Sequence, residues 1–110
     1  MSIVVDTNIV VDANIFGEAC LGTGAASRMV AGCVTGQYTP LMGATLMAEY
    51  EDAMRREALF RRSRLDAAER VDLLNIFLAV CRWTRIHFAW RPSKRHTERG
   101  LQLLTKARGR

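Results

Sequence analysis

Two acidic residues, Asp6 and Glu49, occupy positions that favour a divalent metal site. Asp6 directly follows Ile3-Val4-Val5, a short β-branched run that predicts a strand buried on both faces. Glu49 lies in the first half of a predicted helix, one position off its apolar stripe. Mg²⁺ and Mn²⁺ prefer oxygen ligands and take one or two carboxylates. The pair therefore predicts a site that could activate water and polarise a phosphodiester.

Each acid also has a simpler interpretation. An aspartate after a strand is often only the N-cap of the helix that follows. Glu49 has Glu51 and Asp52 beside it, so it could belong to a solvated, charged helix face. On spacing alone, both interpretations of both residues stay open.

Hydrophobic patterning predicts the elements that position these acids. Short strands are predicted at 3–5, 38–42 and 85–90, and helices at 9–16, 25–34, 45–56, 66–82 and 93–106. Glycines predict a loop at 17–24, and the apolar stripes place Met29 and Gln102 on packed faces. Strands separated by helices need crossover connections, which predicts an α/β fold with a short parallel sheet in three layers. Ligands of such sheets bind beyond the carboxyl ends of the strands, where Asp6 is expected.

Length and composition set limits on the class of protein. A chain of 110 residues has room for one domain, predicted here as residues 1–110. With 49% hydrophobic and 25% charged residues, it is neither a disordered tail nor a collagen. No apolar run approaches the roughly 18 residues of a membrane span, and the first residues lack the basic leader of a signal peptide. Three cysteines without CxxC spacing favour reduced thiols and a cytoplasmic location.

The net charge of +5 comes from the last twenty residues. Residues 91–110 carry seven of the 16 Lys and Arg residues and one of the 11 acidic residues, Glu98. Such a segment can attract the phosphates of a nucleic acid by releasing counterions. The residues predicted to do so are Arg91, Lys94, Arg95 and Arg99. The alternative is a solvated or frayed terminus.

Three segments, in order and at consistent spacing, resemble the PIN-domain family, in the branch described as toxin components of toxin–antitoxin systems. They are residues 3–11 around Asp6-Thr7-Asn8, residues 36–51 around Glu49, and residues 80–92. The resemblance implies a Rossmann-like sheet and a ribonuclease that depends on Mg²⁺ or Mn²⁺. It makes Asp6 and Glu49 the first two acids of the catalytic site, with Thr7 and Asn8 forming hydrogen bonds around them. The partners it implies are RNA and a cognate antitoxin protein.

The resemblance ends after Arg91-Pro92. Relatives continue into an aspartate-rich helix start that supplies a third acid and then into a further strand. Here the basic segment 93–110 follows, so we expect a truncated or frameshifted gene that lacks the C-terminal strands. Missing acids predict impaired catalysis. The alternative function is a non-catalytic remnant that binds RNA or an antitoxin.

The loss of a fourth strand also bears on assembly. The strand order 3-2-1-4-5 implied by the resemblance would leave strand 3–5 at an edge of the sheet. An apolar edge strand without lysine or proline is a template for pairing with another chain. We therefore expect a homodimer or a higher oligomer that pairs through this edge.

Overall fold

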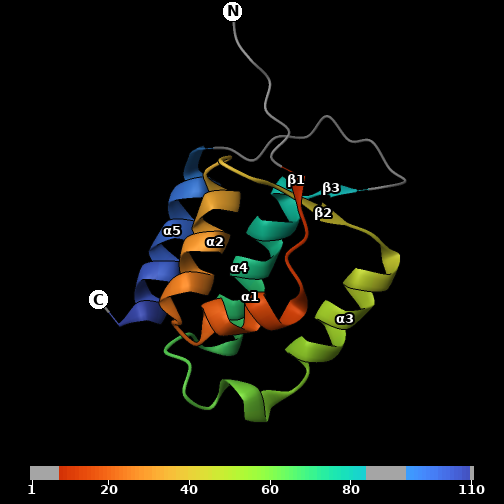
Figure 1. The fold of residues 1–110 in the computed structure, drawn as a ribbon. Helices are drawn as coiled ribbons and strands as arrows, with labels where there is room; N and C mark the ends of the chain where they lie inside the picture. The colour runs from red at the N-terminus through yellow and green to blue at the C-terminus, as the bar shows by residue number, and fades with distance from the viewer. Residues whose placement is uncertain (1–7, 84–93, 110) are drawn as a thin grey trace, which may run out of the picture.

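The computed structural model describes residues 8–83 and 94–109, with side chains from residue 97 onward in the second range. In chain order the elements are β1 (Asn8–Ile9), α1 (Ala13–Cys20), α2 (Gly24–Val34), β2 (Thr39–Met42), α3 (Ala44–Met54), the 3₁₀ helix η1 (Glu57–Phe60), α4 (Ala67–Val80), β3 (Arg82–Trp83) and α5 (Lys94–Arg108). The strands lie together at one end of the molecule and the helices make up the rest (Figure 1). In the part of the chain that is described, no helix has the length and apolar character needed to cross a membrane.

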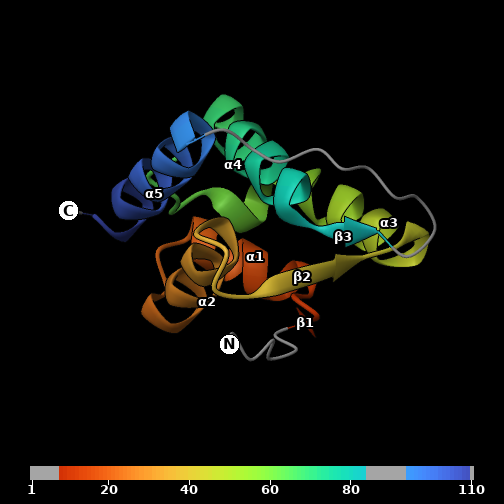
Figure 2. The ribbon, with the colours of Figure 1, turned by 90° about the horizontal axis from the view of Figure 1, so that it is seen from above.

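The strands form one parallel sheet in the order β1-β2-β3. Asn8 aligns with Thr39, and Leu41 aligns with Arg82, so β2 runs between the other two strands (Figure 2). Parallel neighbours need crossover connections, which α1 and α2 supply between β1 and β2, and α3, η1 and α4 supply between β2 and β3. The predicted α/β class with a short parallel sheet is confirmed.

Helix α1 begins later in the chain than the patterning predicts. The strand predicted at 3–5 is outside the described residues and stays a prediction, and β1 pairs two residues predicted to lie in or after a turn. The helix predicted at 9–16 is α1, which begins after Asp12. Asp12 Oδ1 accepts the backbone N–H of Ile15 at 2.9 Å, so this cap decides where the helix begins. Gly17, predicted in a loop, lies inside α1.

The described part of the third strand, β3, directly follows α4. The strand predicted at 85–90 is outside the described residues and stays a prediction. Helix α4 begins with a capping box at Asp66. Asp66 Oδ1 accepts the N–H of Glu69 at 2.8 Å, and Glu69 Oε1 accepts the N–H of Asp66 at 3.1 Å. Two backbone donors that the helix cannot satisfy itself are thereby paired, which begins α4 at a defined residue.

An aromatic cluster joins three helices at the centre of the core. Phe16 of α1, Tyr50 of α3 and Phe77 of α4 are each at most 1% exposed. Their ring centroids lie 5.5 to 5.9 Å apart, within the range of favourable aromatic pairs. The cluster therefore ties the start of α1 to α3, on which Glu49 lies.

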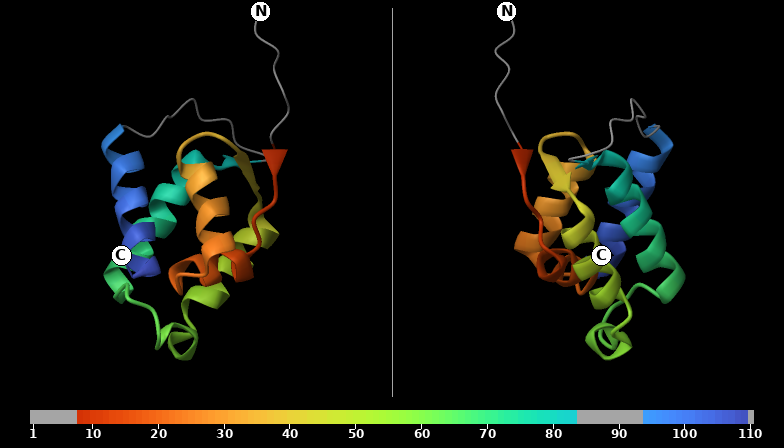
Figure 3. Two further views of the ribbon diagram at one scale, coloured as in Figure 1. Left: turned by 60° about the vertical axis from the view of Figure 1, so that its left-hand side comes forward. Right: turned by 90° about the vertical axis from the view of Figure 1, so that its right-hand side faces the viewer.

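The basic C-terminal segment is part of the core. Helix α5 packs against α2 and α4, and its Leu103, Leu104 and Ala107 are buried (Figure 3). The approach is close at Gly100, where a Cβ would lie 2.9 Å from Cγ1 of Val34 on α2. The interpretation of this segment as a solvated terminus is therefore wrong.

Two residues predicted on packed faces face solvent instead. Met29 is 37% exposed, and Gln102 is exposed on α5. Both predictions followed helical spacing, which identifies a stripe but does not fix its centre. In α5 the buried stripe is centred one residue along the chain from Gln102, because the helix turns this side toward α2 and α4.

Candidate functional site

An open acidic pocket of about 310 Å³ lies between the start of α1 and helix α3. Its carboxylates come from Asp12 at the N-cap of α1 and from Glu49 and Asp52 of α3. Asn14 and Arg56 complete the polar lining, and all five residues are exposed. The pocket therefore offers several oxygen donors to a ligand that approaches from solvent.

The backbone before α1 is held in place by Tyr50. The buried tyrosine hydroxyl donates hydrogen bonds to the carbonyl oxygen of Val11 and, at 3.3 Å, to that of Asp12. Burial is the main cause that raises the pKa of Tyr50, so the hydroxyl keeps its proton and acts as a donor. Because Glu49 precedes Tyr50 in α3, the same contact brings Glu49 and Asp12 to one pocket.

The third carboxylate of the pocket, that of Asp52, forms an ion pair with Arg56. Asp52 Oδ2 lies 2.6 Å from Nη2 of Arg56, one helical turn further along the chain. The two side chains are 64% and 62% exposed, so the pair adds little stability but balances the charge of Asp52. Asp12 and Glu49 are therefore the better candidates for metal ligands.

The donors of the pocket fit a hard cation such as Mg²⁺ or Mn²⁺. Such an ion keeps several waters and is commonly bound by one or two carboxylates together with substrate phosphate. Within residues 8–83 and 97–109, no three acidic, histidine or cysteine side chains come close enough to form a larger metal site. Asp12 and Glu49 together supply the one or two carboxylates with which Mg²⁺ or Mn²⁺ is commonly bound.

Of the residues predicted for the site, Glu49 lies in this pocket and Asn8 lies in β1, where it is exposed. Asp6 and Thr7 fall outside the described residues, so their assignment stays a prediction. Asp12 takes the position expected for Asp6, after a buried apolar residue and before a helix, with Glu49 on the same pocket. The sequence reasoning missed Asp12.

A short duplication in the sequence could have identified it. The six residues Val4-Val5-Asp6-Thr7-Asn8-Ile9 are followed at once by Val10-Val11-Asp12-Ala13-Asn14-Ile15. Both copies place an aspartate after two valines and an asparagine two residues later. Local pattern therefore does not distinguish the copies. The structure places Asp12 and Asn14 of the second copy in the pocket of Glu49, and Asp6 of the first copy lies outside the described residues.

The basic residues predicted to contact nucleic acid are distributed differently. Arg91 is outside the described residues, and Lys94 and Arg95 lie in the first turn of α5. Arg99 Nε donates to Oδ2 of Asp72 on α4 at 2.9 Å, with both side chains close to half exposed. Arg99 therefore links α5 to α4 through an ion pair. Its contact with nucleic acid stays a prediction.

The three cysteines are not suited to nucleophilic chemistry. Burial raises the pKa of Cys20 to about 12, that of Cys33 to about 11 and that of Cys81 to about 12. Only the thiolate is nucleophilic, and at pH 7.5 less than about one thiol in a thousand is ionised at such pKa values. The cysteines therefore act as small apolar core residues.

We predict that the native thiols react with iodoacetamide at pH 7.5 more than about 100-fold more slowly than the thiols of the chain in guanidinium, where the pKa returns to about 8.5. Mass spectrometry of alkylated protein at timed intervals measures both rates. Rapid native alkylation of any one cysteine would contradict the burial described for it.

Comparison with known proteins agrees with this geometry. The PIN-domain family matches residues 2–97, which is most of the chain. No curated protein matches the chain, and neither does any solved structure. With its three-stranded parallel sheet, its crossover helices and an acidic pocket beside the start of α1, the chain belongs to the PIN-domain family. This is a family of nucleases.

Proposed function

We propose that this protein is a ribonuclease that depends on Mg²⁺ or Mn²⁺ and whose acidic centre includes Asp12 and Glu49. The observation that carries the proposal is that these two carboxylates line one pocket in a chain of the PIN-domain family. A bound cation would supply an activated water and neutralise charge on the phosphodiester. The assignment of Asp6 to the same role is the competing hypothesis.

The chain's own residues prepare this pocket in two ways. The N–H of Ile15 holds one oxygen of Asp12, which sets the direction of the carboxylate. Tyr50 holds the backbone at Asp12 while its neighbour Glu49 faces the same pocket. The carboxylate of Asp12 is then oriented before substrate arrives, which lowers the reorganisation that the reaction requires.

Impaired catalysis is a further part of the proposal. Basic residues follow Pro92, in the segment where the resemblance implies a further acid. Two carboxylates hold a cation more weakly than three or four. We therefore expect slow cleavage that needs a high concentration of Mn²⁺.

Cleavage of a labelled single-stranded RNA tests the proposal. Asp12→Asn is expected to slow cleavage by about 10- to 100-fold or more, since even residues that only support metal ligands have effects of this size. Asparagine caps helices as well as aspartate does, so α1 is retained while the charge is removed. Glu49→Gln is expected to behave like Asp12→Asn.

Asp6→Asn is the matched control, because it makes the same change in the other copy of the duplication. Normal cleavage by Asp6→Asn together with loss in Asp12→Asn supports the second copy. Loss of cleavage in Asp6→Asn together with normal cleavage by Asp12→Asn would assign the metal-binding carboxylate to Asp6. Equal cleavage by all variants would remove both acids from the site.

The biological role proposed is that of a toxin held inactive by a cognate antitoxin protein. This rests on the likeness of residues 80–92 to the toxin branch of the family. A cytoplasmic location follows from such a role, because the RNA substrates are there. Homo-oligomer formation through the strand predicted at 3–5, which lies outside the described residues, belongs to the same proposal.

The alternative function is a binding module without catalysis. The cluster of basic residues at the beginning of α5 favours it, because phosphate contacts there need no metal. Binding of RNA by the wild type without any cleavage in Mn²⁺ would support this alternative. Double replacement of Lys94 and Arg95 by alanine would then weaken the dependence of binding on salt.

A further inference from the structure

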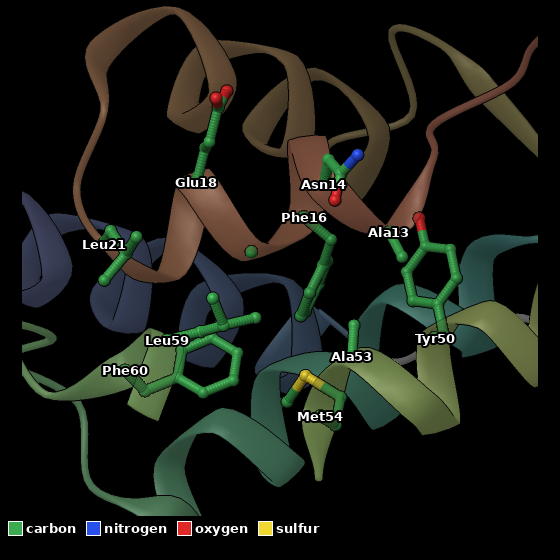
Figure 4. Close-up of a pocket in the computed structure, with 11 residues that line it drawn as sticks. Ala13, Asn14, Phe16, Glu18, Leu21, Tyr50, Ala53, Met54, Leu59 and Phe60 are labelled. Atoms are coloured by element: carbon green, nitrogen blue, oxygen red, sulfur yellow. The ribbon is translucent and has the colours of Figure 1, made fainter. Parts of the chain in front are cut away.

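A second pocket, of about 290 Å³, lies between α1, the C-terminal half of α3 and η1. Its lining is mainly apolar, and Figure 4 shows the side chains of Phe16, Met54, Leu59 and Phe60 turned toward the space between these elements. Glu18 points away from them, on the outer side of α1. The pocket therefore offers an apolar surface to a ligand, with polar groups only at its margin.

The wall that η1 contributes is held rigidly by a buried arginine. Arg70 is 5% exposed, and its guanidinium carbon lies 4.5 Å from the centroid of the Phe60 ring. The same guanidinium donates to the carbonyl oxygen of Leu65 at 3.0 Å and to the carboxylate of Glu57 at 3.1 Å. A cation–π contact and these hydrogen bonds fix the ring that lines the pocket. The pocket is therefore formed before any ligand binds.

The apolar pocket adjoins the acidic pocket. Three residues, Ala13, Asn14 and Ala53, line both. A ligand that spans the two would place an apolar group beside Phe60 and an ion-binding or phosphate group beside Asp12. Asn14 lies at the boundary, and its exposed amide can both donate and accept hydrogen bonds.

We propose that the apolar pocket binds one unpaired base of a single-stranded RNA, adjacent to the phosphodiester that lies at the acidic pocket. This inference rests on the proposed function and names a recognition element of its substrate. Its volume is at the lower limit of about 300–1,000 Å³ for ligand pockets, which suits a single flat ring system. Asn14 is placed to read the polar edge of that base.

A nucleotide chain matches the two pockets better than a peptide does. In an RNA strand each aromatic base is joined through its sugar to a phosphate, so one apolar ring and one anionic group recur at every step. Unpaired bases are recognised by apolar contact with their faces and by hydrogen bonds to their edges. Leu59, 50% exposed, and Leu21, 39% exposed, offer apolar contact in this pocket, and Asn14 offers hydrogen bonds. An apolar side chain of a partner protein is the other occupant, and the experiment below separates the two.

Gly17 provides the means to fill the pocket without disturbing the fold. It lies on α1, lines the pocket, and a Cβ at this position meets no atom within 4 Å. Gly17→Ala and Gly17→Leu both replace a glycine inside a helix by a better helix former, so both are expected to be stable. Gly17→Leu alone brings a bulky side chain to the pocket.

The probe is a fluorescently labelled RNA decamer in Ca²⁺, with a second set of decamers in which each base in turn is missing. We expect one abasic position to weaken binding to the Gly17→Ala protein by about tenfold, which corresponds to about 1.4 kcal/mol. In Gly17→Leu, the intact decamer should bind as weakly as that abasic decamer binds to Gly17→Ala. Equal affinity of the two variants for intact RNA, or no sensitive position, would overturn the proposal.

The two proposals fail in different ways. Base-dependent binding by a protein that does not cleave in Mn²⁺ would keep the subsite and reject the nuclease. Cleavage in Mn²⁺ with no effect of Gly17→Leu on the binding of any decamer would keep the nuclease and reject the subsite. If Gly17→Leu leaves RNA binding intact but abolishes binding of a synthetic amphipathic helix of leucine and lysine, the occupant is a protein side chain and the base subsite is wrong.

Discussion

Replacing Leu103 with alanine is expected to lower the free energy of unfolding by about 2–5 kcal/mol. Leu103 is 1% exposed and belongs to α5, which packs between α2 and α4. Removing its side chain takes apolar contacts from both partner helices and leaves a cavity that they fill only in part. Urea unfolding followed by circular dichroism measures the change.

Gln102→Ala is the matched control, because this exposed residue precedes Leu103 in the same helix. Its effect should stay within about 0.5 kcal/mol. A Leu103→Ala protein as stable as the wild type would show that α5 does not belong to the cooperatively folded core. That result would restore the interpretation of the C-terminal segment as a terminus in solvent.

Phe77→Ala is expected to cost about 3–5 kcal/mol, among the largest effects of any single substitution in this domain. Phe77 is fully buried, with its ring centroid 5.5 Å from that of Phe16 and 5.9 Å from that of Tyr50. Its removal takes one member from the cluster that joins three helices. Marginal domains have only about 5–15 kcal/mol of stability, so much of the protein would unfold on modest warming.

Phe77→Ala should also affect the acidic pocket. The ring of Phe77 stacks nearly parallel on that of Tyr50, with 14° between the planes, and Tyr50 holds the backbone at Asp12. In the folded fraction we therefore expect weaker Mn²⁺ binding, measured by titration calorimetry at low temperature. Val71→Ala, at a half-exposed position of the same helix, should change neither stability nor binding.

The C-terminal segment shows where sequence reasoning was sufficient and where it was not. The spacing of apolar residues predicted a helix at 93–106, and α5 is confirmed in that region. Its basic composition favoured a terminus in solvent or on RNA. Whether such a helix is a tail or part of the core depends on the surface against which it packs, here the side chains of Val34 and Ile76, which approach Gly100 closely. Composition carries no information on that surface.

The candidate site shows the same division. Glu49 was predicted as a site residue from its position beside the apolar stripe of one predicted helix, and it lines the acidic pocket. The sequence contains two aspartates that could be its partner, because Asp6 and Asp12 lie in two copies of one local pattern. Among the described residues, the hydroxyl of Tyr50 binds the backbone at Val11 and Asp12, which brings Asp12 to the pocket of Glu49. That contact joins residues far apart in the chain, and no local rule predicts it.

The sequence by itself determined the α/β class, the alternation of strands and helices and the membership of the PIN-domain family. Each of these depends on periodicity or on motifs that are contiguous in the chain. Only the tertiary structure decided that α5 is core, that Asp12 and Glu49 line one pocket, and that an apolar pocket adjoins it. These depend on packing between distant segments, in which close contact and the pairing of buried polar groups select one arrangement among several that local patterns allow.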